Sequence, residues 1–145
     1  MAIVALTPAH ELLLVEQYRQ PILQSVIELP AGLAGDDPGT SGEPPLKAAQ
    51  RELLEETGYV SGDWTRLMSG PSSAGLTDET VEMFLARSAT QQTNGGGVGE
   101  EEITLHRVPL NSTIPWLMAK QAAGVTVDFK VIAGILLAQN ALANQ

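Results

Sequence analysis

A glycine- and proline-rich loop followed by a sharply bounded helix runs from Gly32 to Gly58, and it constrains the fold more than any other stretch. Pro44 and Pro45 suit a first helical turn, where no backbone N–H donor is required. Gly58 suits the left-handed residue that follows a helix. One side of this helix carries, at helical spacing, Leu46, Ala49, Leu53 and Thr57. We therefore predict a helix from Pro44 to Thr57.

Short apolar runs around this helix have the length and composition of strands. We expect strands at Ala2–Leu6, Leu12–Glu16, Val26–Leu29, Trp64–Ser69, Glu79–Ala86 and Ile103–Val108. Further helices are expected at Asn111–Ala123 and, with Asp128 as N-cap, as far as about Ala143. The polar, glycine-rich stretch Gln91–Gly99 is typical of an exposed, flexible segment. This order predicts an α/β fold, with a mixed β-sheet sandwiched between α-helices.

The length of 145 residues, without repeats or a linker, predicts a single domain over residues 1–145. Cysteine is absent, which excludes disulfides, zinc–thiolate sites and a cysteine nucleophile. The start of the chain lacks the basic region of a signal peptide, and the apolar run Val131–Leu142 is too short to span a bilayer. We expect a cytoplasmic protein with no membrane partner.

The charge balance is strongly acidic, with 8 basic against 17 acidic residues and a net charge of −9. No basic stripe is available to grip a nucleic-acid backbone, so we expect no nucleic-acid partner. A phosphate ligand would require a local reversal of sign, which divalent cations can provide.

Three carboxylates project from one side of the predicted helix, because Glu52 lies three and four residues before Glu55 and Glu56. Such like charges repel, so the face must be either solvated or neutralised by cations. Carboxylate oxygens are ligands that Mg²⁺ and Mn²⁺ prefer, and Arg51 can pair with Glu55 at i+4. A solvated face is the ordinary reading of such a pattern, but the preceding glycine-rich loop favours a phosphate and metal site.

The same residues resemble the Nudix hydrolase signature: Gly, five residues, Glu, seven residues, then Arg-Glu-aliphatic-x-Glu-Glu-x-Gly-aliphatic. This chain has Glu43, seven residues, and then Arg51-Glu52-Leu53-Leu54-Glu55-Glu56-Thr57-Gly58, with Tyr59 in the last place. Its opening glycine matches Gly32, although ten residues separate Gly32 from Glu43, so the loop is about five residues longer than the pattern.

Five further segments are similar to the ADP-ribose pyrophosphatase branch of that family. They are Val15–Arg19, Ile27–Gly32, Gly70–Glu79, Glu100–Ile103 and Asp128–Lys130. The resemblance implies a Nudix fold and Mg²⁺-dependent cleavage, with Mn²⁺ as a possible substitute, of the pyrophosphate of a small nucleoside diphosphate derivative. The first candidate is ADP-ribose, which would give AMP and ribose 5-phosphate. It also implies a homodimer. Members of that branch usually carry extra N-terminal strands that help build the dimer and part of the adenine site, whereas this chain begins almost directly with Ala2-Ile3-Val4-Ala5.

By this resemblance, Glu52 and Glu56 bind the metal together with the Ala31 carbonyl, and Glu55 assists, held by Arg51. Glu101 is the expected general base, with Glu100 second and Glu102 third. The residues expected to contact substrate are Arg19, Glu28, Leu33, Gly75 and Leu76.

Several alternatives stay open on the sequence alone. Arg19 could instead pair with Glu16, and Glu28 could bind ribose hydroxyls or pair with Arg19. The substrate could be another nucleotide sugar, such as GDP-mannose, or a dinucleotide polyphosphate. The domain could also be a non-catalytic nucleotide-binding module. His10 and His106 have no ligand spacing, and Trp64 and Trp116 are expected in the core, with adenine stacking as the less favoured role.

Overall fold

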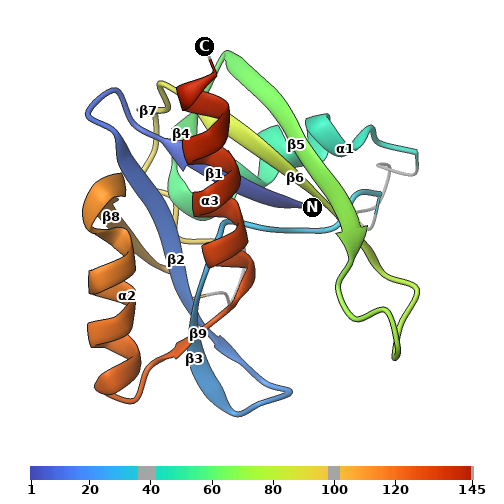
Figure 1. Ribbon diagram of the computed structural model, residues 1–145. Coiled ribbons are helices and arrows are strands. Elements are labelled where there is room, and N and C mark those ends of the chain that lie inside the picture. The colour runs from blue at the N-terminus through green and yellow to red at the C-terminus, as the bar shows by residue number, and fades with distance from the viewer. Residues whose placement is uncertain (36–41, 98–101, 145) are drawn as a thin grey trace.

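The computed structural model describes residues 1–35, 42–97 and 102–144, and its main layer is a mixed sheet (Figure 1). Within these residues the strand order is β5-β6-β1-β2-β3-β9, with β8 paired to β2. β1 pairs in parallel with β6, and β3 with β9, while the remaining pairs are antiparallel. The strands of this sheet are β1 (Ala2–Leu6), β2 (Glu11–Arg19), β3 (Gln24–Glu28), β5 (Asp63–Pro71), β6 (Thr80–Arg87), β8 (Thr104–Pro109) and β9 (Thr126–Val127).

Helices cover both faces of the sheet, which confirms the predicted sandwich. They are α1 (Pro45–Glu52), continued by the π-helical η1 (Leu53–Thr57), the 3₁₀ turn η2 (Leu110–Ser112), α2 (Thr113–Ala122) and α3 (Lys130–Ala143). Figure 1 shows α3 crossing the sheet, with α2 alongside β8. A separate two-stranded ribbon joins β4 (Tyr59–Val60) to β7 (Thr90–Gln91).

Alternation along β1 divides the interior into two apolar cores, because successive side chains of a strand point to opposite faces. Val4 packs with Leu117 of α2 and Val131 of α3. Ile3, the preceding residue, packs instead with Ala49 and Leu53 of the α1–η1 helix. Every residue of β1 is buried, so this strand holds the two helical layers together.

Close packing of α3 on the sheet depends on Gly134. A Cβ at this position would lie 2.9 Å from Leu29 Cδ1 and 2.9 Å from Val4 Cγ2. The side chains around the helix therefore leave no room for a methyl group, and glycine allows α3 to approach β1 and the residue that follows β3.

The six predicted strands are all present, with ends that differ by at most three residues, and the predicted helix Pro44–Thr57 is found as α1 and η1. Gly58 ends that helix with φ of 77°. Ala49, Leu53 and Thr57 are fully buried, but Leu46 is 37% exposed. The two-residue strands β4, β7 and β9 were not expected, since so few residues show no periodicity.

The predicted N-cap Asp128 was wrong by one residue, because Phe129 takes the N-cap position of α3. The Asp128 carboxylate still accepts the Lys130 N–H at 2.7 Å at the start of this helix. Trp64 packs against one apolar core, edge to face with Phe84, and Trp116 packs against the other. No helix in the described part of the chain is long and apolar enough to cross a membrane.

Candidate active site

The three glutamates of the acidic motif lie where α1 passes into the π-helical turn η1. Leu53 and Thr57 anchor this turn in the core, and Gly58 N–H donates to the Leu54 carbonyl at 2.8 Å. Glu56 is only 6% exposed, while Glu52 and Glu55 are half-buried. Single π-helical turns inside helices are frequent at functional sites. Burial of Glu56 costs free energy unless the carboxylate is hydrogen-bonded or bound to a cation.

The segment that leaves β3 lies directly against these carboxylates. The Ala31 N–H donates to Glu56 Oε2 at 3.0 Å. A Cβ at Gly32 would lie 2.1 Å from Glu52 Cδ, so a side chain at this position would have to displace the Glu52 carboxylate. Ile3 N–H donates to the Pro30 carbonyl at 2.8 Å, which fixes the segment to β1. The contact at Ala31 uses its N–H, and a metal-binding role for its carbonyl stays a prediction.

Arg51 joins the acidic helix to both ends of the long loop. Its Nη1 lies 2.9 Å from Glu52 Oε1 and 3.0 Å from Glu55 Oε2, which confirms the predicted pairing with Glu55. Its Nη2 donates to the Leu33 carbonyl at 3.3 Å and to Glu43 Oε2 at 3.4 Å. Glu43, which ends the long loop, is therefore an ion-pair partner of Arg51.

The charge of Arg51 is stabilised by its surroundings. Burial works to lower the pKa of Arg51, but the facing carboxylate of Glu52 and the hydrogen bonds to Glu43 and Glu55 outweigh it, so the pKa is raised above its ordinary value. The guanidinium therefore stays protonated and offsets part of the negative charge of the helix.

Arg19 of β2 and Glu28 of β3 form an ion pair, with Arg19 Nε 2.6 Å from Glu28 Oε2. The strand register places Arg19 opposite Gln24 and Glu28 opposite Val15, so the pair is made diagonally between the strands. The alternative pairing of Arg19 with Glu16 was wrong, because Glu16 Oε2 lies 2.8 Å from His106 Nε2 and 3.9 Å from Lys120 Nζ. His106 is thus a polar residue with a structural partner, as its lack of ligand spacing indicated.

A pocket of about 280 Å³ gathers four of the predicted site residues, and we call it the polar pocket. Its lining includes Arg19, Glu28, Ala31 and Leu33, together with Gly32. Met1, Glu79, Val81 and Lys130 complete it. Glu79 and Lys130 lay in segments that resembled the ADP-ribose branch, but no periodicity or charge pattern predicted that they meet here.

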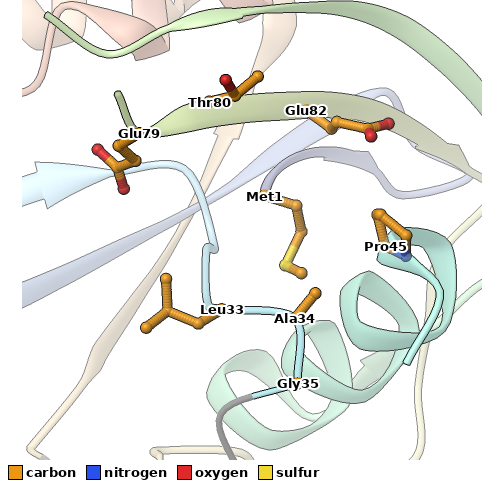
Figure 2. Close-up of a pocket in the computed structure, with 8 residues that line it drawn as sticks. All are labelled: Met1, Leu33, Ala34, Gly35, Pro45, Glu79, Thr80 and Glu82. Atoms are coloured by element: carbon orange, nitrogen blue, oxygen red, sulfur yellow. The ribbon is translucent and has the colours of Figure 1, made fainter. Parts of the chain in front are cut away.

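A second pocket, of about 400 Å³, shares Met1, Leu33 and Glu79 with the polar pocket. Figure 2 shows Met1 between strand β6, which carries Thr80 and Glu82, and the loop that carries Leu33 and Ala34, with Pro45 of α1 beside it. The two pockets therefore lie side by side between the end of β3, the start of β6 and the first turn of α1.

Gly75 and Leu76 do not reach these pockets. Leu76 is 90% exposed, and a Cβ at Gly75 would meet nothing within 4 Å. Leu76 N–H donates to the Ser73 carbonyl at 3.0 Å, so this loop between β5 and β6 closes on itself. A substrate role for these two residues stays a prediction.

The predicted bases Glu100 and Glu101 lie outside the described residues, and Glu102 is exposed ahead of β8. The glycines that precede them contact the acidic helix directly. Gly96 N–H donates to the Glu56 carbonyl at 2.9 Å, and Gly97 N–H to the Glu55 carbonyl at 3.1 Å.

The stretch Gln91–Gly99 was expected to be exposed. This holds for residues 91–94 but not for the half-buried residues 95–97, and residues 98 and 99 lie outside the described part of the chain. Gly58 and Gly95 account for this contact. A Cβ at Gly58 would lie 2.2 Å from the Thr93 carbonyl oxygen, and a Cβ at Gly95 would lie 2.4 Å from the Thr57 carbonyl carbon. Both have positive φ, and the two backbones cross without intervening side chains.

The oxygen-rich donor set suits a hard divalent cation. Among the described residues, no three acidic or histidine side chains converge as a preformed metal cage. Mg²⁺ usually binds through one or two carboxylates and completes its shell with water and substrate phosphates, so such a cage is not required. The buried Glu56 and the half-buried Glu52, both in contact with the backbone after β3, fit that kind of site.

Comparison with known proteins agrees with this geometry. A profile of the NUDIX domain matches residues 1–129. The chain is 33% identical over 122 residues to the methanol dehydrogenase activator of Bacillus methanolicus, covering 83% of this chain and 63% of that protein. It is 33% identical over 141 residues to the ADP-ribose pyrophosphatase of Mycobacterium tuberculosis, covering 94% and 62%. It is 34% identical over 91 residues to the GDP-mannose pyrophosphatase of Citrobacter koseri, covering 61% and 44%.

The chain thus spans less than two thirds of the length of each of these relatives. A crystal structure of an ADP compounds hydrolase has the same fold, with a TM-score of 0.78 and 22% identity, over 99% of this chain and 72% of that one. With the family profile matching nearly the whole length, and the acidic helix lying against the glycine-containing segment after β3, this chain belongs to the Nudix family.

Proposed function

We propose that this chain is a Mg²⁺-dependent Nudix hydrolase that cleaves the pyrophosphate of a nucleoside diphosphate derivative, with ADP-ribose as the first candidate substrate. The observation that carries the proposal is the contact of Ala31 and Gly32 with Glu56 and Glu52. This contact joins the acidic helix to a pocket that also holds an arginine, so cation ligands and a phosphate-binding group share one site.

Glu52 and Glu56 would hold the divalent ion, with the Ala31 carbonyl completing the protein ligands and Glu55 assisting. Mg²⁺, or Mn²⁺ in its place, would offset the phosphate charge and polarise the attacked phosphorus. Arg51 holds the carboxylates of Glu52 and Glu55 in fixed positions through hydrogen bonds of 2.9 and 3.0 Å. This positioning keeps one glutamate from turning away when its neighbour binds a cation.

Arg19 would bind a phosphate oxygen, because a guanidinium can donate two parallel hydrogen bonds to phosphate. Glu28 would orient it through the 2.6 Å contact to Nε, so that the Nη groups could donate to the phosphate. Glu28 can also accept hydrogen bonds from ribose hydroxyls. Leu33 lines both pockets and would pack against the sugar.

A carboxylate after Gly97 would remove a proton from the attacking water, with Glu101 as the first candidate and Glu100 as the second. The water oxygen bonds to one phosphorus while the bond from that phosphorus to the bridging oxygen breaks. The products from ADP-ribose are AMP and ribose 5-phosphate. The hydrogen bonds of Gly96 and Gly97 to the helix support a base on this segment, because they start it beside Glu55 and Glu56.

The relatives support two substrate classes, since one is named for ADP-ribose and another for GDP-mannose. The three glutamates of the motif and the buried state of Glu56 favour an enzyme over a non-catalytic binding module. A cytoplasmic location and a homodimer also belong to this proposal. A monomer mass by light scattering at micromolar concentration would contradict the dimer.

A substrate panel with Mg²⁺ tests the function. It compares ADP-ribose, GDP-mannose, diadenosine polyphosphates and nucleoside triphosphates, with product analysis by chromatography. We expect AMP and ribose 5-phosphate from ADP-ribose, abolished by EDTA and restored by Mg²⁺. Preferential turnover of GDP-mannose would make GDP-mannose the substrate in place of ADP-ribose and would still support pyrophosphate cleavage. No turnover of any compound would favour the binding module.

A further inference from the structure

A third pocket, of about 130 Å³, lies between the end of β5, strand β6 and the start of α3, and we call it the apolar pocket. Its lining includes Met68, Val81, Met83, Phe129, Lys130 and Ala133. Val81 and Lys130 also line the polar pocket, so the two hollows are adjacent. The metal and phosphate assignment does not use the apolar pocket.

Phe129 is the least expected member of this lining, because its side chain is 72% exposed. Ligand pockets are lined mainly by hydrophobic and aromatic side chains, and Phe129 adds an exposed aromatic ring to the lining of this one. The Lys130 amine lies 5.6 Å from the centre of the Phe129 ring and is ion-paired with Asp128. These contacts join Lys130 to the two residues before it, while the exposed Phe129 ring forms part of the pocket lining.

The two hollows differ in the chemistry that they offer. The polar pocket offers the charged groups of Arg19, Glu28 and Lys130, which suit phosphate and sugar hydroxyls. The apolar pocket offers two methionine side chains, Val81, Ala133 and an aromatic ring, which suit a flat apolar group. A nucleoside diphosphate has the same sequence of parts, since a charged pyrophosphate is joined through a ribose to an aromatic base.

We propose that the apolar pocket binds the nucleobase of the substrate, in contact with Phe129, while the pyrophosphate lies toward Glu52 and Glu56. This assignment rests on the proposed hydrolase function. Phe129 is then a specificity-determining residue. Lys130, which lines both pockets, lies between the base and the pyrophosphate.

Kinetics of Phe129→Ala provide the first test, with ADP-ribose and Mg²⁺. We expect KM to rise roughly tenfold with kcat nearly unchanged, because base–aromatic contact contributes to binding and not to the chemical step. Leu136→Ala is the matched control: Leu136 lies on α3 with a 66% exposed side chain and is not among the residues that line the described pockets. Ala133→Phe, which fills the pocket instead of emptying it, should raise KM as well and serves if Phe129→Ala does not fold.

Methionine methyl NMR provides the second test, independent of catalysis and of metal. The chain has four methionines: Met68 and Met83 report on the apolar pocket, Met1 on the polar pocket, and Met118 of α2 serves as internal control. Adenosine or guanosine, added without phosphate or Mg²⁺, should shift the Met68 and Met83 resonances, leave Met118 unchanged, and lose this effect in Phe129→Ala.

The two tests separate this proposal from the hydrolase function. If the enzyme is active and its KM is unchanged in both Phe129→Ala and Ala133→Phe, the base assignment is wrong, whether or not nucleosides shift the methyl resonances. The proposed hydrolase reaction is not contradicted by that result. A protein without hydrolase activity whose Met68 and Met83 respond to nucleosides keeps the base pocket and overturns the function. Absence of both activity and methyl shifts overturns both.

Discussion

Gly32 and Glu52 are in direct contact: a Cβ at Gly32 would lie 2.1 Å from both Cδ and Oε1 of Glu52. Gly32 has no positive φ, so its backbone conformation alone does not require glycine. The requirement comes from the carboxylate, which occupies the place of a side chain. The long loop after Gly32 therefore begins at a point fixed by the acidic helix.

Gly32→Ala should reduce hydrolase activity more than stability. The new methyl group displaces the end of a flexible glutamate side chain, and a misplacement of about 1 Å at a catalytic centre can reduce the rate on the order of 100-fold. Activity with Mg²⁺ and the melting temperature are measured together. Gly62→Ala is the control, since a Cβ there meets nothing within 4 Å. Full activity of Gly32→Ala would show that the position of Glu52 does not matter.

Glu52→Gln and Glu56→Gln should each reduce turnover by roughly 100-fold or more, because bound metal stabilises the transition state by several kcal/mol. Neither should unfold the protein, since the glutamine carbonyl at position 56 can still accept the Ala31 N–H. Asp63→Asn, which alters an ion pair with Arg87 at the start of β5, is the control. Wild-type activity in both glutamine variants would contradict the metal assignment.

Arg51→Lys should lower activity by about tenfold or more, because one ammonium group cannot reproduce the fork geometry of a guanidinium. The loss should be independent of pH. The pKa of Arg51 is raised, so the stabilisation from its charge is complete below its ordinary value and is lost only at still higher pH. A lysine, with an ordinary pKa of about 10.4, is also charged at neutral pH. Rate profiles from pH 6 to 9, a range well below these values, should therefore run parallel, and rescue of the variant at one end would contradict the positioning role.

Arg19→Ala should raise KM by about tenfold or more, since a charge-assisted hydrogen bond contributes roughly 1.5–3 kcal/mol. Its effect on unfolding should stay within about 1 kcal/mol, because Arg19 is partly exposed and such ion pairs contribute little. Arg66→Ala removes a comparable ion pair, with Glu82 at 2.7 Å, from a position that lines none of the described pockets. Equal KM values in the two variants would remove Arg19 from the phosphate site.

Glutamine scanning of Glu100, Glu101 and Glu102 should identify the base. General-base catalysis contributes on the order of 10²–10⁴-fold, so one variant should lose activity to that extent while the others change little. The expected order of loss is Glu101, then Glu100, then Glu102. Turnover is measured at saturating Mg²⁺, so that weaker metal binding cannot imitate the loss of a base. Near-wild-type turnover in all three would move the base to another segment.

The parts of the fold that sequence predicted are those governed by local periodicity. Short apolar runs located the strands, and the spacing of Arg51 and Glu55 predicted their contact, because residues four apart meet on any helix. Similarity to a branch suggested Arg19 and Glu28 but left their pairing open. The strand register alone does not set it, since Arg19 lies opposite Gln24 and Glu28 opposite Val15. The side-chain conformations bring Arg19 Nε to Glu28 Oε2.

The contacts that sequence could not predict join distant segments. Lys130 reaches the polar pocket only because α3 begins beside β6, about a hundred residues from β3 in the chain. Phe129 carries no periodic signal, and its exposure follows from its place just before the first turn of α3. The half-buried glycines at 95–97 looked like a linker, because composition does not report which backbone a glycine lies against.

The close contact between the backbones at Gly58 and Gly95 limits which amino-acid substitutions this region can tolerate. The segment that carries the candidate bases is anchored by main-chain atoms, with Gly58 and Gly95 admitting no side chain and Gly96 and Gly97 supplying amide donors. The exposed side chains at 91–94 take no part in that anchoring beyond the local bonds of Gln91 and Thr93. Among active variants selected from a saturation library across this region, positions 91–94 should therefore carry many different residues, and positions 58 and 95 should carry only glycine.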